Sequence, residues 1–363
     1  MTSQETESPL TYPWKDFLPE FGQLKEVHPG VFWLRLPLPF ALDHINVWLL
    51  RDEFNGQPGW TLIDTGVALD EQKAIWQHLF RHGLEGLPIV RVLVTHMHPD
   101  HVGLAGWLCA HWQAPLWMSM TDYTVASLWV QPPSETNSLA SLGQATAAHY
   151  ARNGLTDADL LEQIRARDSY YSNLVGPLPT QFHRLLHGDN VTIDGAQWQA
   201  IVGYGHAPEH LSFWCAEKNL LISGDMVLPR ISTNVSVHAY EPDSDPLTLY
   251  LNSLDNYAHV DGQALVLPSH GRPFYGLHER IKQQHEHHAE RLQETYEACA
   301  QRPISAADLV PIMFKRPLDA HQMTFAMGEA LAHLHALYYA GKLQRQLDDD
   351  GIYRFTSIAQ EAN

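Results

Sequence analysis

The chain has 363 residues, of which 45% are hydrophobic and 18% are charged, and its formal net charge is −18. This composition is typical of a globular protein with a full-sized core, and the length suffices for one large domain and a smaller one. The acidic balance argues against a nucleic-acid backbone as the main partner, because phosphate binding draws on an excess of lysine and arginine.

Three further features of the composition narrow the class of protein. The three cysteines are scattered without C-x-x-C spacing, so we expect reduced thiols rather than a disulfide framework. The N-terminus is polar and acidic, without the basic and apolar regions of a signal peptide. No apolar run approaches the length of a membrane span. We therefore predict a cytoplasmic enzyme that does not act at a membrane.

The first part of the chain predicts alternating strands and helices. Residues 1–20, punctuated by proline, predict a loose N-terminal arm. Strands are expected over 31–36, 45–50, 60–64 and 89–94, which are rich in β-branched and aromatic residues, and a helix over 70–82 that ends at Gly83. Strand, helix and strand in this order are typical of an α/β fold.

The stretch Thr95-His96-Met97-His98-Pro99-Asp100-His101 directly follows the strand expected over 89–94. On extended backbone, residues two apart point to the same side, so His96 and His98 can face one ion. Once the chain turns, Asp100 and His101 can face a second ion. Imidazole and carboxylate suit zinc, and also iron or manganese. The alternative is three unrelated histidines in a chain that has 23, but the preceding strand and the following glycines favour a metal site.

A helical block follows, with helices expected over about 121–130, 137–152 and 156–171. We interpret about 120–180 as an insertion, which either covers the site as a lid or packs on a sheet as a helical layer. It carries Tyr170 and Tyr171, which are candidates for substrate contacts.

Three more candidate ligands each follow a predicted strand. His206 comes after the strand 198–202, Asp225 ends the segment 221–225 that begins in the strand 219–222, and His270 follows 265–267. Small residues and glycines flank each of them, which lets the backbone approach closely. Ligands at separate strand ends are what a site at one sheet edge requires. The candidates for substrate contacts beyond these strand ends are His210, Arg230, Asn234 and His238. For His210, a hydrogen-bonded loop histidine without a role in binding is an equal alternative.

Residues 276–363 predict a C-terminal helical module. A long amphipathic helix is expected over 277–300, and we expect its histidines 278, 285, 287 and 288 to lie on a solvated face rather than to form a second metal site. Helices from about 305 and over 322–340 precede a predicted hairpin of 343–347 and 352–355, an order that suggests a winged helix. Its expected role is packing or homodimerisation. A nucleic-acid role is the alternative, but the aspartates at 348–350 would repel phosphate.

Taken together, these candidate ligands make the chain resemble the metallo-β-lactamase superfamily. The matching motifs are His96-x-His98-x-Asp100-His101, His206, Asp225 and His270, which span about residues 25–275. Within the superfamily the chain looks like the glyoxalase II-like hydrolases. Its 205–210 segment, its 223–225 turn and its tail resemble the β-lactamase-like protein 2 branch. The resemblance implies a four-layer αβ/βα sandwich, with a catalytic domain over 21–275 that carries metals at one edge.

The resemblance also implies a role for each ligand. His96, His98 and His206 would hold one metal, and Asp100, His101 and His270 the other. Asp225 would bridge both, and Asp64 would orient a ligand histidine. The cofactors would be two divalent ions, most simply zinc, with iron or manganese as alternatives. Two departures from the family matter: the interval from His101 to His206 is long, and position 98 is histidine where oxygen-reducing diiron members carry glutamate.

We therefore predict metal-assisted hydrolysis. Two ions about 3.5–4 Å apart lower the pKa of a shared water, and one of them stabilises the oxyanion that forms after attack on a carbonyl. Asp100 or Asp225 would orient that water, and no G-x-S-x-G nucleophile motif is present. The expected substrate is a small acyl ester or thioester, such as an acyl-CoA. The alternatives are a lactonase or β-lactamase, a phosphodiesterase or endoribonuclease, an iron-dependent sulfur dioxygenase and a non-enzymatic regulator.

Overall fold

The computed structural model describes residues 10–131 and 141–358, and the chain divides into two compact units. The sheet unit comprises Met1–Gln131, Tyr171–Thr233 and Ser253–Lys282, and the helical unit comprises Pro132–Tyr170, Asn234–Asn252 and Gln283–Asn363. The predicted boundary between 21–275 and 276–363 remains a prediction. Two earlier segments, 132–170 and 234–252, group with the C-terminal part of the chain.

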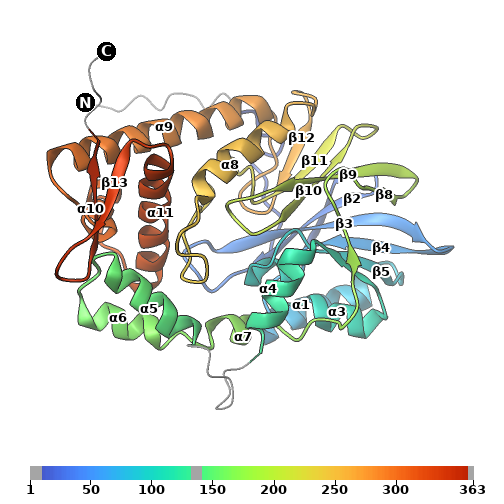
Figure 1. Cartoon of the computed structure of the whole chain (residues 1–363). Coiled ribbons are helices and arrows are strands. Elements are labelled where there is room, and N and C mark those ends of the chain that lie inside the picture. Colours follow the sequence, from blue (N-terminus) through green and yellow to red (C-terminus); the bar gives the residue numbers. More distant parts are fainter. Residues whose placement is uncertain (1–9, 132–140, 359–363) are drawn as a thin grey trace. The chain divides into compact units, whose positions relative to one another are not determined.

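The sheet unit contains two β-sheets (Figure 1). The first has seven strands in chain order: β1 (Leu24–His28), β2 (Val31–Pro37), β3 (His44–Phe54), β4 (Gln57–Ile63), β5 (Ile89–Leu93), β6 (Leu116–Met118) and β7 (His183–Arg184). The second has the order β12 (Leu265–Pro268), β11 (Leu220–Gly224), β10 (His210–Cys215), β9 (Ala196–Gly203) and β8 (Asn190–Ile193). Strands β4, β5, β6 and β7 pair in parallel, as do β11 and β12. Their carboxyl ends therefore point to the same edge of each sheet.

The main core lies between the two sheets. Trp33 and Trp48 face each other across β2 and β3, and they share one buried cluster with Trp198 of β9 and Phe213 of β10. All four side chains are fully buried, and each contributes roughly 2–3 kcal/mol from the apolar area it removes from water. The Trp33 indole N–H also donates to Asn46 Oδ1 at 2.7 Å. This packing fixes the sheets face to face.

Helices cover the outer face of the seven-stranded sheet. The helices α1 (Asp70–His82) and α3 (Ala105–Trp112) contact β2 and β5, and Figure 1 shows α4 (Met120–Trp129) beside them. The short α2 (Pro99–Val102) carries part of the histidine stretch, and α7 (Tyr170–Leu174) lies at the unit boundary. On the outer side of the second sheet, η1 (Asp255–Tyr257) contacts β9. The predicted α/β sandwich is confirmed.

The N-terminal segment is more ordered than predicted from residue 10 onward. Leu10 is buried, and Thr11 forms a β-bridge with Tyr275. The Arg272 guanidinium donates to the carbonyl oxygens of Trp14 and Lys15. The prediction of a loose arm over 1–20 is therefore wrong for 10–20, and residues 1–9 lie outside the described part.

The helical unit contains most of the remaining helices and a hairpin. They are α5 (Leu142–Arg152), α6 (Ala158–Arg165), most of α8 (Pro246–Leu254), most of α9 (Leu277–Gln301), α10 (Ala306–Met313), α11 (Ala320–Tyr339), β13 (Leu343–Leu347) and β14 (Tyr353–Ser357). Capping boxes start α10 at Ser305 and α11 at Asp319. The predicted hairpin is confirmed, and of the helix expected over 137–152 the first residues lie outside the described ranges. The winged-helix comparison and the lid remain predictions.

The structure describes the cysteines and the character of the helices within these ranges. The thiols of Cys109, Cys215 and Cys299 are buried and unpaired. None of the helices in 10–131 and 141–358 combines the length and apolar character of a membrane span.

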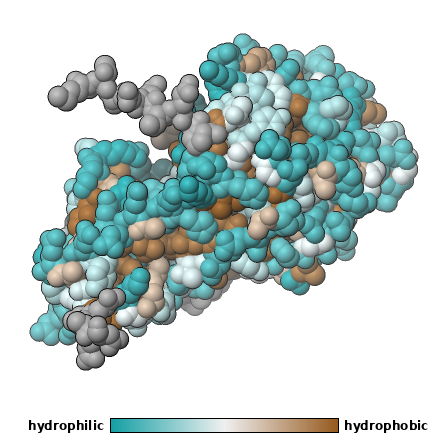
Figure 2. Space-filling model, turned by 90° about the horizontal axis from the view of Figure 1, so that it is seen from above, coloured by the Kyte–Doolittle hydropathy of each residue, from teal (hydrophilic) through white to brown (hydrophobic). Residues whose placement is uncertain are grey.

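The face seen in Figure 2 is mostly hydrophilic, with smaller hydrophobic areas between polar ones.

One histidine of α9 contradicts the expected solvated face. His288 is 1% exposed, and its Nδ1 lies 3.3 Å from Nε2 of the fully buried His333 on α11. The His333 Nδ1–H donates to the Glu329 carbonyl oxygen, so its Nε2 accepts a hydrogen bond from His288. Burial lowers the pKa of His288 to about 3 and that of His333 to about 4. Both rings therefore stay neutral and join α9 to α11.

This neutral pair predicts a loss of stability in mild acid. Between pH 6.5 and about 4 the unfolded chain protonates these histidines and the folded chain does not, so the free energy of unfolding falls as the pH falls. At pH 5 the loss is on the order of 2 kcal/mol for each histidine. Urea unfolding at pH 7 and pH 5 should show that His288→Gln loses about 2 kcal/mol less than the wild type. Parallel pH profiles would contradict this explanation.

Candidate metal centre

Seven candidate ligands meet at the edge where β5, β11 and β12 end. They are His96, His98, Asp100 and His101 after β5, His206 between β9 and β10, Asp225 after β11, and His270 after β12. Their donor atoms form three overlapping groups, and within each group these atoms lie within 4.8 Å of one another: His96, His98 and His206; His96, His101 and Asp225; Asp100, His101 and His270. The structure thus brings together residues from four separate places in the chain.

The first group, which we call the three-histidine cluster, consists of His96, His98 and His206. Nε2 of His96 lies 2.8 Å from Nδ1 of His98 and 3.2 Å from Nε2 of His206. Burial and the neighbouring histidines lower the pKa values of His96 and His98 well below the usual range. Neutral imidazoles with converging nitrogens are the form in which histidine binds a metal.

The second group, the mixed cluster, consists of Asp100, His101 and His270. Asp100 Oδ2 lies 3.4 Å from His270 Nε2 and 3.6 Å from His101 Nε2. Burial alone would raise the pKa of Asp100, but the charges of His101 and His270 outweigh it and lower the pKa to about 2. The mixed cluster therefore contains a permanent carboxylate, which suits a hard or borderline divalent cation.

Asp225 lies between the two clusters. Its Oδ2 is 3.4 Å from Nε2 of His206 and 3.4 Å from Nε2 of His270, so one oxygen reaches a member of each cluster. The same oxygen is 3.6 Å from His101 Nε2. Asp225 Oδ1 and His101 Nε2 are buried and have no hydrogen-bond partner among the residues that the structure describes. Unpartnered buried ligand atoms that face a shared space fit a site for cations.

Without metal ions, protonated histidines balance the negative charge of the carboxylates in this site. Burial alone would lower the pKa of His101 and His270, but the carboxylates of Asp100 and Asp225 outweigh it. The pKa of His101 is raised well above its usual range and that of His270 to about 10. Positively charged histidines thus pair with the carboxylates. Divalent cations would take over this role and release the protons.

Hydrogen bonds fix which ring nitrogens face the site. Asp64 is 1% exposed, and its Oδ2 accepts the His101 Nδ1–H at 2.8 Å, which leaves His101 Nε2 pointing at the mixed cluster. Asp64 Oδ1 accepts the Thr95 backbone N–H at 2.8 Å. His270 Nδ1–H donates to the His44 carbonyl oxygen at 2.8 Å. The contact of Asp64 with His101 is compatible with the orienting role that the resemblance implies, whereas no motif pointed to His44.

Asp64→Asn is expected to weaken metal binding by about 10- to 100-fold, because an amide does not hold the His101 ring in one tautomer as a carboxylate does. Isothermal titration with zinc measures this directly. Asp52→Asn is the matched control, since Asp52 is another buried carboxylate that pairs with Arg91 and touches no candidate ligand. Equal zinc affinities for the Asp64 variant and the wild type would refute the orienting role.

Two residues predicted to contact substrate are instead buried supports. His210 is fully buried, its Nε2 accepts the Asp225 backbone N–H at 3.0 Å, and a Cβ on Gly224 would meet its ring at 2.3 Å. Tyr171 is 5% exposed, and its hydroxyl donates to the Met97 carbonyl oxygen at 2.6 Å. Both side chains hold backbone that carries ligands, so the prediction of substrate contacts is wrong for them.

The other predicted substrate contacts do not share one unit. Arg230 is exposed in the sheet unit, and it stays a candidate. Tyr170, Asn234 and His238 belong to the helical unit. There the Arg167 guanidinium lies 4.2 Å from the Tyr170 ring centroid, and the Asn234 side chain accepts a hydrogen bond from Ser236. Their part in substrate binding remains a prediction.

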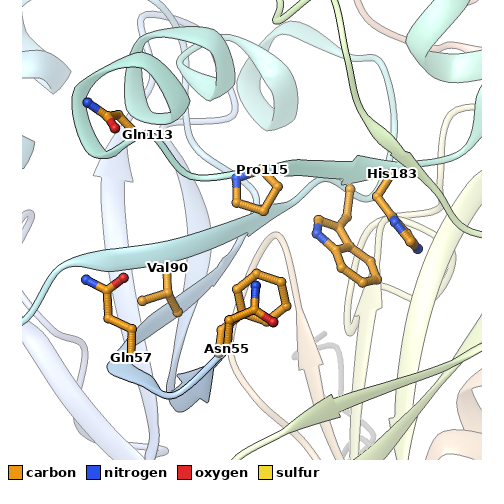
Figure 3. A pocket seen from close by; sticks show the side chains of 8 residues that line it. Asn55, Gln57, Val90, Gln113, Pro115 and His183 are labelled. Carbon is orange, nitrogen blue, oxygen red and sulfur yellow. The ribbon is translucent and has the colours of Figure 1, made fainter.

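A pocket lies at the end of the seven-stranded sheet that is opposite to the candidate ligands (Figure 3). Asn55 and Gln57 of the β3–β4 hairpin line it, with Val90 at the start of β5 and Trp117 stacked on His183. The candidate ligands follow the other end of β5. This pocket is therefore separate from the metal centre.

The comparisons with known proteins cover nearly the whole chain. Residues 41–270 match the model of the metallo-beta-lactamase superfamily, and residues 292–358 match the metallo-beta-lactamase-like, C-terminal domain. The crystal structure of a beta-lactamase domain protein from Burkholderia ambifaria is 50% identical, with a TM-score of 0.90 over 96% of this chain and 98% of that one. A metallo-beta-lactamase family protein from Thermus thermophilus is 26% identical, with a TM-score of 0.73 over 92% and 100%.

A curated relative adds an expected class of activity. The probable metallo-hydrolase YqjP of Bacillus subtilis (strain 168) is 23% identical over 85% of this chain and 92% of its own length. The family model covers more than half of the chain, and its match includes all seven candidate ligands. The chain therefore belongs to the metallo-β-lactamase superfamily.

Proposed function

We propose that this metallo-hydrolase holds two divalent cations, one in the three-histidine cluster and one in the mixed cluster, and that it hydrolyses a carboxylic ester or thioester. The observation that carries the proposal is the position of Asp225, whose Oδ2 is 3.4 Å from a histidine of each cluster. Such a carboxylate suits a bridge between two ions. Zinc is the proposed metal, with iron or manganese as alternatives.

Cations bound there would lower the pKa of water and polarise a carbonyl group. The chain's own part is to keep His96 and His98 neutral, to supply two carboxylates and to restrict access. Most ligands are buried, whereas His98 and Asp100 are partly exposed. Substrate would therefore approach over His98 and Asp100. In this proposal the Asp100 carboxylate accepts a hydrogen bond from the attacking water.

Two features of the chain favour an ester or thioester as the substrate: its acidic net charge and the histidine at position 98. A net charge of −18 opposes a polyanionic backbone, which disfavours RNA and other phosphodiesters. A lactone or β-lactam presents the same kind of carbonyl and is the second candidate. Histidine at position 98 supplies a neutral ligand, which favours hydrolysis over the chemistry of oxygen-reducing diiron sites. Sulfur dioxygenation would need one iron per chain, so metal analysis separates it.

A substrate panel tests this proposal. Acyl p-nitrophenyl esters, acyl-CoA thioesters, lactones, a chromogenic β-lactam and bis-p-nitrophenyl phosphate should be assayed with zinc-loaded protein, beside Asp225→Asn. We expect the highest kcat/KM on an ester or thioester, and its loss in the variant. Preference for the phosphodiester would overturn the substrate class but keep the hydrolase. Cytoplasmic location and homodimer formation stay predictions.

A further inference from the structure

Asp122 is a buried carboxylate that lies outside the seven candidate ligands. It stands in the first turn of α4 and is fully buried. Burial raises its pKa to about 6, although three groups donate hydrogen bonds to it. Removing a carboxylate from water is unfavourable unless its partners compensate. The partners of Asp122 are therefore informative.

Each oxygen of Asp122 accepts a hydrogen bond from a different ligand-bearing loop. Oδ1 accepts the Met97 backbone N–H at 2.8 Å, and Met97 stands between His96 and His98. Oδ2 accepts the Glu209 backbone N–H at 2.7 Å, and Glu209 follows His206 by three residues. One side chain thus ties together the two loops of the three-histidine cluster, which lie more than 100 residues apart in the chain.

Neighbouring contacts strengthen this connection from both sides. Glu209 Oε2 accepts the Thr121 backbone N–H at 3.2 Å, so the His206 loop and the start of α4 bind each other reciprocally. The Tyr171 hydroxyl holds the carbonyl oxygen of Met97, the residue whose N–H Asp122 holds. Ser119 Oγ–H donates to Asp122 Oδ2 at 3.1 Å. The carboxylate is therefore held firmly between the two loops.

The mixed cluster relies on other contacts. His101 is oriented by Asp64, and His270 by the His44 carbonyl oxygen. Within the described part of the chain, the hydrogen bonds of Asp122 go to Met97, Glu209 and Ser119. The loop held at Met97 also carries Asp100 and His101, but other groups orient the rings of His101 and His270, so we expect the larger effect of Asp122 on the three-histidine cluster.

We propose that Asp122 is a positioning residue that sets the geometry of the three-histidine cluster by clamping its two loops. The inference rests on the proposed function in one respect, namely that this cluster binds a cation. Two acceptor oxygens are needed, because both loops present a backbone N–H. An amide at this position supplies one acceptor and turns an NH₂ group toward the other N–H.

The test is the affinity of each metal equivalent in Asp122→Asn, measured by titrating metal-free protein with zinc and, separately, with Co²⁺ followed by absorption. We expect the wild type to bind two equivalents. In the variant, one equivalent weakens by about 10- to 100-fold and its Co²⁺ spectrum changes, while the other equivalent is retained. Ser119→Ala is the matched control, since it removes one donor to Asp122 and leaves both loops attached.

Two reference variants identify the equivalent that changes. In a His206→Ala background, which lacks a ligand of the three-histidine cluster, Asp122→Asn should cause little further loss of metal affinity. In a His270→Ala background it should weaken the remaining equivalent. If Asp122→Asn does not fold, Tyr171→Phe removes the other hold on Met97 and is expected to affect the same equivalent.

The outcomes separate the two proposals. Equal weakening of both equivalents, or of neither, would overturn the positioning role of Asp122 and leave the proposed function intact. A wild type that binds no divalent cation would overturn the proposed function itself.

Discussion

Asp225→Asn is expected to lower kcat/KM by more than about 100-fold on whichever substrate the wild type hydrolyses. Loss of a residue that only orients a metal ligand typically lowers metal affinity or activity by about 10- to 100-fold. Asp225 is itself a candidate ligand whose Oδ2 lies near histidines of both clusters, so its loss should cost more. Asparagine keeps the size of the side chain but not its negative charge. Initial rates at several zinc concentrations measure the effect.

The control for this variant is Asp194→Asn. Asp194 is exposed at the turn between β8 and β9 with φ +50°, a conformation that asparagine adopts readily. Its activity should equal that of the wild type. Unchanged kcat/KM in Asp225→Asn would exclude Asp225 from the chemistry.

Removal of divalent cations is expected to abolish hydrolysis and to lower the thermal stability. Without cations, the raised pKa values of His101 and His270 keep both rings protonated at neutral pH, and cations that bind there would displace these protons. A cation present at 100 times its Kd stabilises the folded state by about 2.7 kcal/mol. Activity and Tm should be followed through dialysis against a chelator and then through addition of Zn²⁺, Mn²⁺ or Fe²⁺.

Zinc should restore both quantities, and the metal that restores most activity identifies the preferred cofactor. Asp64→Asn offers a comparison, because it should need more zinc for the same recovery. Protein that keeps full activity after exhaustive chelation cannot work as proposed.

The edge of the sheets that carries the candidate ligands was predictable because its residues follow strand ends. The apolar strands before His96, Asp225 and His270 are visible in the sequence, and the carboxyl ends of β5, β11 and β12 meet at this site. Spacing alone also placed His96 and His98 on one side of the backbone. These arguments need no knowledge of the side chains around the site.

The supports of the site were not predictable in the same way. Asp122 binds two backbone N–H groups, and nothing in the residue types of Met97 and Glu209 reveals that their amides lie close together. For His210, four residues after His206, the sequence left substrate contact and a hydrogen-bonded loop histidine as equal alternatives. Its complete burial depends on how Gly224 packs against its ring.

Residue type misled the interpretation of α9, where position was the better guide. Leu277, Gln284 and His288 recur at helical spacing and are all buried, so they share the inner face of the helix. His288 was expected on the solvated face because histidine is polar. The grouping of 132–170 and 234–252 with the C-terminal part was also missed. It depends on contacts between segments far apart in the chain, which composition does not encode.

Anomalous diffraction from crystals of zinc-loaded protein tests the central claim most directly. We predict two zinc peaks at the ends of β5, β11 and β12, one bound by His96, His98 and His206 and one by Asp100, His101 and His270, with Asp225 bound to both. Peaks elsewhere, or an Asp225 carboxylate that contacts neither ion, would contradict it.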